Sequence, residues 1–127
     1  MDVFVNTKTI RLEWDYMPPS ELRGNSRVHW RVRSQVTKQF KESTEWRLRE
    51  IDPDPMGKIR IKYIAHWCGK RIDPDNLIKG MKPALDALTE YGVIEDDNPD
   101  YITGIDWEYH RVKHKNEVKM IMEVSEA

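Results

Sequence analysis

The run KIRIKYIAHW, residues 58–67, alternates apolar and polar side chains, with Ile64 as its one exception. Such alternation is typical of a β-strand with one buried face, because successive side chains of a strand point to opposite sides of the sheet. We therefore predict a strand here. Its inward side chains are expected to be Ile59, Ile61, Tyr63, Ala65 and Trp67.

A further strand and a long helix are predicted before this strand. Residues 9–14 alternate in the same way and are followed by a proline-containing turn. The inward side chains of this strand are expected to be Ile10, Leu12 and Trp14. Residues 26–50 contain neither Gly nor Pro, and their apolar side chains recur every four positions, which indicates an amphipathic helix with Ser26 as its N-cap. Those apolar positions are Val28, Val32, Val36 and Phe40.

One more helix and two more strands are predicted in the C-terminal half of the chain. Residues 73–92 have helical periodicity, with Gly92 as the C-cap and with a break near residues 80–83 caused by Pro83. Two alternating runs follow, and the polar segment between them is expected to be a hairpin turn. Their inward positions are Ile105, Trp107, Tyr109, Val118, Met120, Met122 and Val124. The order β-α-β-α-β-β predicts one α+β domain over residues 1–127, with a mixed sheet of about four strands and two main helices.

Length and composition narrow the class of protein. A chain of 127 residues suffices for one hydrophobic core, and 39% hydrophobic with 34% charged residues is typical of a soluble globular protein. No long apolar run and no basic leader followed by an apolar run occurs, so we expect no membrane span, no signal peptide and a cytoplasmic location. The single cysteine, Cys68, has no partner at zinc-ligand spacing and is expected to be a half-buried structural residue.

Charged side chains are unevenly distributed, although the formal net charge is only −1. Residues 22–41 carry six basic side chains and no acid, and residues 110–115 form a second basic cluster. Acidic side chains gather in residues 95–100 and in two copies of Ile-Asp-Pro-Asp, at 51–54 and 72–75. This segregation is expected of a protein that binds a polyanion with one surface and holds cations with another.

The second Ile-Asp-Pro-Asp copy is the candidate site. Asp73 and Asp75 lie where a strand passes into a helix, and Asp96 and Asp97 follow that same helix. If the helix folds back along the sheet, these carboxylates form an oxygen-only site suited to Mg²⁺, with Mn²⁺ as a substitute, and to phosphodiester hydrolysis. A lysine beside them would stabilise charge on the phosphate. In an unbroken helix one polar stripe runs from this site through Asp75, Lys79, Lys82 and Asp86.

Structural interpretations of the same residues stay open. A lone Asp-Pro-Asp-Asn is most often a helix N-cap with an Asx turn, and Lys82 with Asp86 also fits an exposed helical ion pair. A calcium-binding loop is excluded, because Leu77 and Ile78 occupy positions that need a ligand and a glycine. The first Ile-Asp-Pro-Asp copy, at residues 51–54, has no lysine or acidic partner downstream and is expected to be a plain turn.

Taken together, these motifs resemble the RusA family of Holliday junction resolvases, particularly its phage-type members. The resemblance covers roughly residues 16–124 and rests on DPDN (73–76), KPALDAL (82–88), Gly92 followed by EDD (95–97), and the pattern N-x-R-x-H-W (25–30). It implies a Mg²⁺-dependent homodimer that cuts two opposed strands of a four-way DNA junction. It also implies that Asp73, Asp75 and Asp97 bind the metal, with Asp96 adjacent. A related nuclease acting on flaps or forks, and a branched-DNA-binding protein that does not cut, are the alternatives.

The resemblance leaves two candidates for the catalytic lysine. Counting from Asp-Ala-Leu selects Lys82, and counting from Asp-x-Asp-Asn selects Lys79. The two counts differ because this chain has three more residues between the two motifs than the shorter members of the family have. We prefer Lys82, since KPALDAL is the better local match. The expected DNA contacts are Asn25, Arg27, His29, Trp30, Arg31, Arg33 and Lys38 and, in the hairpin, Lys113 and Lys115. Arg27 and Arg31 are expected one helical turn apart beside Trp30, which suits phosphate contact and base stacking.

Overall fold

A computed structural model of the chain describes residues 8–24 and 27–127. Its four strands form one mixed sheet in the order β1-β4-β2-β3. The strands are β1 (Thr9–Trp14), β2 (Ile59–Trp67), β3 (Ile102–Arg111) and β4 (Lys119–Glu126). β2 pairs in parallel with β3 and antiparallel with β4, and β1 pairs antiparallel with β4. The predicted fold class, α+β with a mixed four-stranded sheet, is confirmed.

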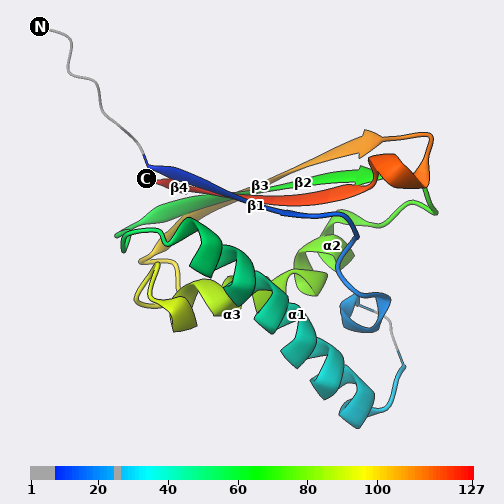
Figure 1. Cartoon of the computed structure of the whole chain (residues 1–127), viewed down its shortest axis with the longest axis horizontal. Coiled ribbons are helices and arrows are strands. Elements are labelled where there is room, and N and C mark those ends of the chain that lie inside the picture. The colour runs from blue at the N-terminus through cyan, green and yellow to red at the C-terminus, as the bar shows by residue number, and fades with distance from the viewer. Residues whose placement is uncertain (1–7, 25–26) are drawn as a thin grey trace, which may run out of the picture.

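The helices α1 (Trp30–Ile51), α2 (Pro74–Gly80) and α3 (Lys82–Tyr91) lie on one side of the sheet (Figure 1). Short 3-10 turns occur at η1 (Ser20–Leu22) and η2 (Lys115–Glu117). α2 and α3 are the two halves of the predicted second helix, so the expected break before Pro83 is confirmed. Gly92 ends α3 with φ at 96°, a left-handed conformation that glycine adopts without strain, as predicted for a C-cap.

The core lies between the helices and the sheet face toward them. The predicted inward side chains of β1 and β2, with the exception of Trp67, are at most 9% exposed, and those of β4 are fully buried. Full burial of a Leu or Ile side chain contributes about 1.5–3 kcal/mol to the stability of the fold. Trp67 packs partly against the edge of the core, and Cys68 beside it is free and half-buried, as expected. No helix in the described ranges is long and apolar enough to cross a membrane.

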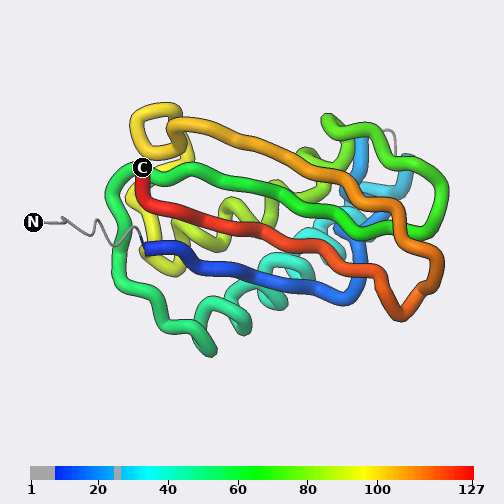
Figure 2. The backbone as a smooth tube through the Cα atoms, turned by 90° about the horizontal axis from the view of Figure 1, so that it is seen from above, coloured from blue at the N-terminus to red at the C-terminus, as the bar shows by residue number. Residues whose placement is uncertain are grey.

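β3 does not bury its predicted inward face. Ile105 and Trp107 are 42% and 45% exposed, and only Tyr109 packs partly against the core. β3 forms the edge of the sheet that lies farther from α1 (Figure 2). The prediction that Ile105 and Trp107 are buried was therefore wrong, because alternation indicates which face a side chain occupies and not whether another element covers that face.

The last two strands do not form the predicted hairpin. β3 and β4 both pair with β2, so β2 lies between them and residues 112–118 pass around its end (Figure 2). The backbone N–H of Val112 donates to the carbonyl of Trp67 at 3.1 Å, which attaches this crossing to the end of β2. The hairpin prediction was wrong because two consecutive strands with a short polar connection have the same local pattern whether or not a third strand separates them.

α1 begins later than predicted. It starts at Trp30, and the ring Nδ1 of His29 accepts a hydrogen bond from the backbone N–H of Arg31 at 3.2 Å, so His29 is the N-cap. The predicted N-cap, Ser26, lies outside the described residues. Since the helix does not include Arg27, the expectation that Arg27 and Arg31 are one helical turn apart was wrong.

α1 packs against the rest of the molecule from its middle to its C-terminal end, whereas its first turns are exposed. Its buried side chains are Phe40, Thr44 and Leu48. Val28 and Val32, predicted to belong to the same apolar stripe, are 36% and 44% exposed. The N-terminal half of α1 slants away from the sheet (Figure 1), so the first part of the predicted stripe does not reach the core.

Candidate functional site

The first Ile-Asp-Pro-Asp copy ends α1 and is a turn, as expected. Asp52 has φ at 48°, and its backbone N–H donates to the carbonyl of Leu48 at 2.7 Å. Aspartate is one of the few non-glycine residues that tolerates this left-handed conformation. Its carboxylate accepts a hydrogen bond from the hydroxyl of Tyr91 at 3.0 Å, so its role here is structural.

The second copy joins β2 to α2. Asp73 precedes the first helical residue in extended backbone (φ −66°, ψ 144°), but its carboxylate makes no capping hydrogen bond. Pro74 takes the first helical position, where its fixed φ suits a helix start and its missing N–H is not needed. Asp73 and Asp75 are both exposed. Asp73 thus occupies the N-cap position without using its carboxylate for capping, which leaves the oxygens available for a ligand.

α2 is held against the segment that precedes α1. A Cβ atom at Gly24, where φ is +38°, would lie 1.9 Å from Oδ1 of Asn76. A Cβ atom at Gly80 would lie 2.9 Å from Cβ of Pro18 and 3.0 Å from Cγ of Arg23. Glycine is needed at both positions for this close approach. These contacts place Arg23 and Gly24 against α2.

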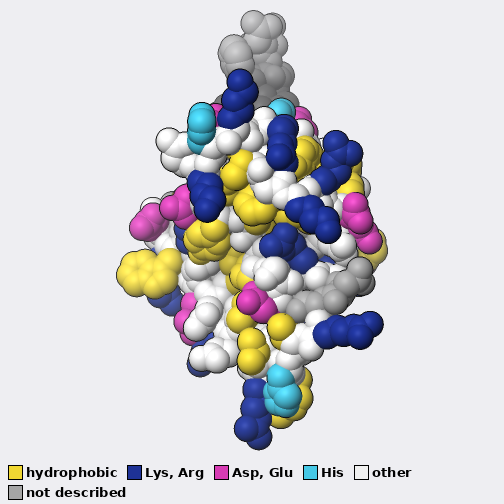
Figure 3. Space-filling view, turned by 90° about the vertical axis from the view of Figure 1, so that its right-hand side faces the viewer, with side chains coloured by type: hydrophobic (Ala, Val, Ile, Leu, Met, Phe, Trp, Pro, Cys, Tyr) yellow, Lys and Arg dark blue, Asp and Glu magenta, His cyan; other side chains and the backbone are white. Residues whose placement is uncertain are grey.

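Asp73 faces a hollow bordered by basic side chains, which we call the basic hollow. It has a volume of about 340 Å³ and is lined by Arg23, Trp67, Lys70, Arg71, Ile72, Asp73 and Asn76. Figure 3 shows this end of the molecule, where Lys and Arg side chains lie among apolar ones. The DNA contacts expected from the sequence did not include Arg23, Lys70 or Arg71. The signal for two of them was their position directly before the motif, in Lys-Arg-Ile-Asp-Pro-Asp.

Arg23 is the least solvated cation of the basic hollow. Burial lowers the pKa of its guanidinium below the usual value, and the negative charge of Glu21 partly offsets this. Its Nε is buried and has no hydrogen-bond partner among the described residues. An unpaired buried donor destabilises a fold by about 1–3 kcal/mol.

The structure brings Lys82 and Asp97 together. Nζ of Lys82 lies 2.5 Å from Oδ2 of Asp97 and 3.0 Å from Oδ1 of Asp86. The hydrogen bond from Lys82 and its positive charge hold the pKa of Asp97 below its ordinary value, and the same contact raises the pKa of Lys82. Asp96 orders the loop, because its carboxylate accepts from the backbone N–H of Asp97 at 2.7 Å and from Nδ2 of Asn98 at 3.1 Å.

The break between α2 and α3 divides the predicted polar stripe, so the stripe is not continuous. Asp75 and Lys79 are one turn apart on α2, whereas Lys82 lies on α3 beyond the break. Lys79 is exposed and has no ion pair within the described ranges. Of the two candidate lysines, Lys82 contacts Asp97 and Lys79 follows Asp75 by one helical turn.

The carboxylates expected to bind metal do not form one cluster. Within residues 8–24 and 27–127, no three His, Cys, Asp or Glu side chains are arranged to hold an ion. Asp73 and Asp75 lie at the start of α2, whereas Asp97 is paired with Lys82. Mg²⁺ is commonly bound through one or two carboxylates and keeps water and phosphate oxygens as its other ligands. The exposed oxygens of Asp73 and Asp75 fit that kind of site.

The expected DNA contacts fall into two groups, at the start of α1 and around η2. Both groups lie at the same end of the molecule, on the right of Figure 1. The exposed members are Arg27, His29, Trp30, Arg31, Arg33, Lys38, Lys113 and Lys115. Asn25 lies outside the described residues. The guanidinium carbon of Arg31 is 5.4 Å from the centre of the Trp30 ring, and Trp30 is 67% exposed, so this pair presents a cation and an aromatic surface together.

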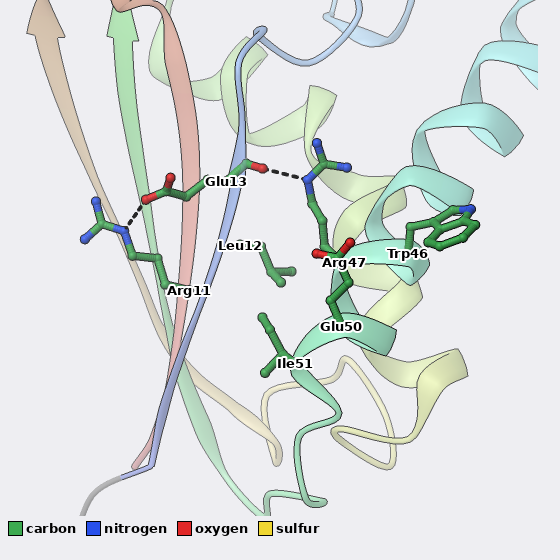
Figure 4. A pocket seen from close by; sticks show the side chains of 7 residues that line it. All are labelled: Arg11, Leu12, Glu13, Trp46, Arg47, Glu50 and Ile51. Atoms are coloured by element: carbon green, nitrogen blue, oxygen red, sulfur yellow. Dashed lines mark hydrogen bonds and ion pairs between the residues drawn. The ribbon is translucent and has the colours of Figure 1, made fainter.

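Another hollow, of about 550 Å³, lies between β1 and the C-terminal half of α1 (Figure 4). It is lined by Arg11, Leu12, Glu13, Trp46, Arg47, Glu50 and Ile51. Nε of Arg47 donates to the backbone carbonyl of Glu13 at 2.6 Å, and Nε of Arg11 donates to the carboxylate of Glu13 at 2.9 Å. Acids and bases are matched here, and none of the predicted site residues lines this hollow.

The sheet face away from the helices is neutralised by its own ion pairs. These pairs are Arg11–Glu13, Arg11–Glu123, Lys119–Glu13, Lys62–Glu108 and Arg60–Asp106. Surface pairs of this kind contribute little to stability. They leave little positive charge free on that face, whereas Lys70 and Arg71 have no ion pair within the described part of the chain.

Comparisons with known proteins add no relative, since no protein-family model and no curated protein matches the chain. Its function therefore has to be inferred from the basic hollow around Asp73, from the pair Lys82 and Asp97, and from the resemblance of its motifs to a known family.

Proposed function

We propose that the protein is a Mg²⁺-dependent, structure-selective endodeoxyribonuclease that resolves four-way DNA junctions. The observation that carries this proposal is Asp73, an exposed and uncommitted carboxylate facing a hollow lined by Arg23, Lys70 and Arg71. A negative charge at a polyanion-binding surface weakens binding unless it holds a cation. Basic side chains for DNA phosphates beside oxygen ligands for Mg²⁺ are the combination that phosphodiester hydrolysis needs. The motifs that resemble the RusA family support the same reading.

Each group at the site has a role in this mechanism. A Mg²⁺ ion bound here would supply an activated water molecule and would neutralise charge on the phosphate. Asp73 and Asp75 would hold it through their exposed oxygens. Lys70 and Arg71 would bind the DNA backbone at the rim and present the scissile phosphate to the carboxylates. Lys82, or Lys79, would stabilise phosphate charge, and Lys82 would do so by exchanging Asp97 for phosphate.

A homodimer is part of the proposal. A four-way junction has approximate two-fold symmetry, so paired cuts need two matched sites related by a two-fold axis. Exposed apolar side chains that no described element covers leave area for an interface, at Ile105 and Trp107 on β3 and at Val32 on α1. The cytoplasmic location expected from the sequence also belongs to this proposal.

The substitution Asp75→Asn tests the metal role. We expect the variant to bind a synthetic four-way junction without Mg²⁺ as the unmodified protein does, and to lose Mg²⁺-dependent nicking, because an amide is a much weaker ligand than a carboxylate. The matched control is Asp54→Asn, the same position in the first Ile-Asp-Pro-Asp copy, which should cleave normally. Mg²⁺-dependent cleavage retained by Asp75→Asn would refute the assignment.

The pairing of Asp97 with Lys82, which occupies one of the expected metal ligands, favours one alternative, a branched-DNA-binding protein that does not cut. Incubation of the protein with Mg²⁺ and a four-way junction, a flap, a fork or a plain duplex decides between the functions. Symmetric nicks in the junction support the proposed resolvase. Faster cutting of the flap or fork supports a related nuclease, and tight junction binding with no nicks in any substrate supports the binding protein.

A further inference from the structure

A more apolar hollow adjoins the basic hollow, and we call it the aromatic pocket. It has a volume of about 520 Å³, and its apolar walls include Tyr16, Pro18, Pro19 and Trp67. Arg23 and Trp67 line both hollows. A ligand in the aromatic pocket would therefore lie next to the hollow that Asp73 faces.

The indole of Trp67 is held in a fixed orientation. Its Nε1 donates to the backbone carbonyl of Lys70 at 2.7 Å. Gly69 lies against the ring so closely that a Cβ atom there would be 2.4 Å from Cζ2 of Trp67. A planar group that stacks in this pocket meets a surface that is already ordered, so little conformational entropy is lost on binding.

The charged residues of the pocket lining are two cations and one acid. Arg23 and Lys115 are the cations, and the Nε of Arg23 is the buried donor without a partner among the described residues. Asp15 is the acid, and its oxygens are able to accept a hydrogen bond from a ring or amino N–H of a nucleobase. Apolar walls together with two lining cations are complementary to a planar, largely apolar ring that carries a phosphate, as a nucleotide does.

We propose that the aromatic pocket binds one unstacked nucleobase of the DNA, while Arg23 and Lys115 hold its phosphate. This inference rests on the proposed function and adds what the site recognises. A base in continuous duplex is stacked and paired, and extracting it costs a few kcal/mol, whereas a base at a branch point or in a single strand is already accessible. The pocket would thus favour branched over continuous DNA before any cleavage takes place.

The test compares two single-stranded oligonucleotides of equal length and charge, one with bases and one built from abasic deoxyribose phosphates, in binding assays without Mg²⁺. We expect the full-length protein to bind the oligonucleotide with bases about 5- to 150-fold more tightly, the range that stacking of one base gives. Tyr16→Ala should bring the two affinities close together. Lys115→Gln should weaken binding of both oligonucleotides by the same factor.

Trp46→Ala and Trp30→Ala are the two control substitutions of this test. Trp46→Ala removes an exposed aromatic side chain at the distant hollow between β1 and α1 and should leave the affinity ratio unchanged. The proposal would be overturned if the unmodified protein bound the two oligonucleotides with equal affinity. It would also be overturned if Trp30→Ala, and not Tyr16→Ala, abolished the difference between the two affinities. Failure of the proposed function is seen separately, as absence of Mg²⁺-dependent nicking in any DNA substrate.

Discussion

The acidic side chains of the candidate site differ in their contacts. Asp73 and Asp75 are exposed and have no ion pair within the described ranges, whereas Asp97 is bonded to Lys82 at 2.5 Å. A carboxylate held by a lysine is a poorer metal ligand than a free one, because the metal has to displace the ammonium group. The two carboxylates at the start of α2 are thus the ones available to bind a cation. Lys82 can release Asp97 and bind a phosphate in its place.

Replacing Lys82 with Met should raise the pKa of Asp97 toward its ordinary value, because the hydrogen bond and charge of Lys82 are the largest causes of its depression. Because the folded-state pKa of Asp97 is depressed, the stabilisation from this pair is present above the unfolded-state pKa and is lost as pH falls through the folded-state value. Titration of the Asp97 carboxyl carbon by NMR measures the shift. Lys79→Met is the matched control and should leave that titration unchanged, while an unchanged Asp97 in Lys82→Met would contradict the contact.

Within a single element, α1 combines a packed half and an exposed half. It packs on the core through Phe40, Thr44 and Leu48, while its first turn carries the exposed side chains of Trp30, Arg31 and Val32. Helical periodicity does not distinguish the two halves, because the same spacing of apolar side chains continues through both.

Alanine substitutions in α1 should therefore differ sharply in their effect on stability. Leu48→Ala removes a fully buried side chain and should lower the free energy of unfolding by about 2–5 kcal/mol. Val32→Ala changes a side chain that is 44% exposed and should alter it by no more than about 0.5 kcal/mol. Urea unfolding followed by circular dichroism measures both, and comparable losses would mean that the N-terminal half packs as tightly as the C-terminal half.

Over the whole molecule, charge is divided between a neutralised sheet face and a basic end. The outer face of the sheet pairs its acids and bases, as in Lys62–Glu108 and Arg60–Asp106. The end of the molecule that carries the basic hollow, the start of α1 and η2 presents Lys and Arg side chains among apolar ones (Figure 3). A net charge of −1 thus coexists with a surface that can bind a polyanion.

Affinity for junction DNA should fall steeply as salt rises, since binding releases counterions from the phosphates. Arg71→Gln should weaken binding and reduce the slope of log affinity against log salt by about 1, the effect of one lost phosphate contact. Arg60→Gln, on the outer face of the sheet, is the matched control and should leave the slope as it is. An affinity that is flat between low and moderate salt would contradict the basic surface.

The candidate site could be predicted from sequence where its residues are neighbours in the chain. Asp73 and Asp75 were found between a strand and a helix because the alternation of β2 ends at Trp67 and helical periodicity begins a few residues later. Arg23 was not recognised, because its position beside Asp73 depends on the close approach of Gly24 and Gly80 to neighbouring elements. That approach has no local signature in the sequence.

The sequence by itself determined the strands and helices, their inward faces in β1, β2 and β4, and the break before Pro83, because each depends on side chains a few residues apart. Tertiary structure alone decided that β2 lies between β3 and β4, that Trp107 is left exposed, and that Lys82 pairs with Asp97. The reason is physical, since strand order, coverage of a face and contacts across a helix break depend on which distant segments pack together. No local pattern encodes that choice.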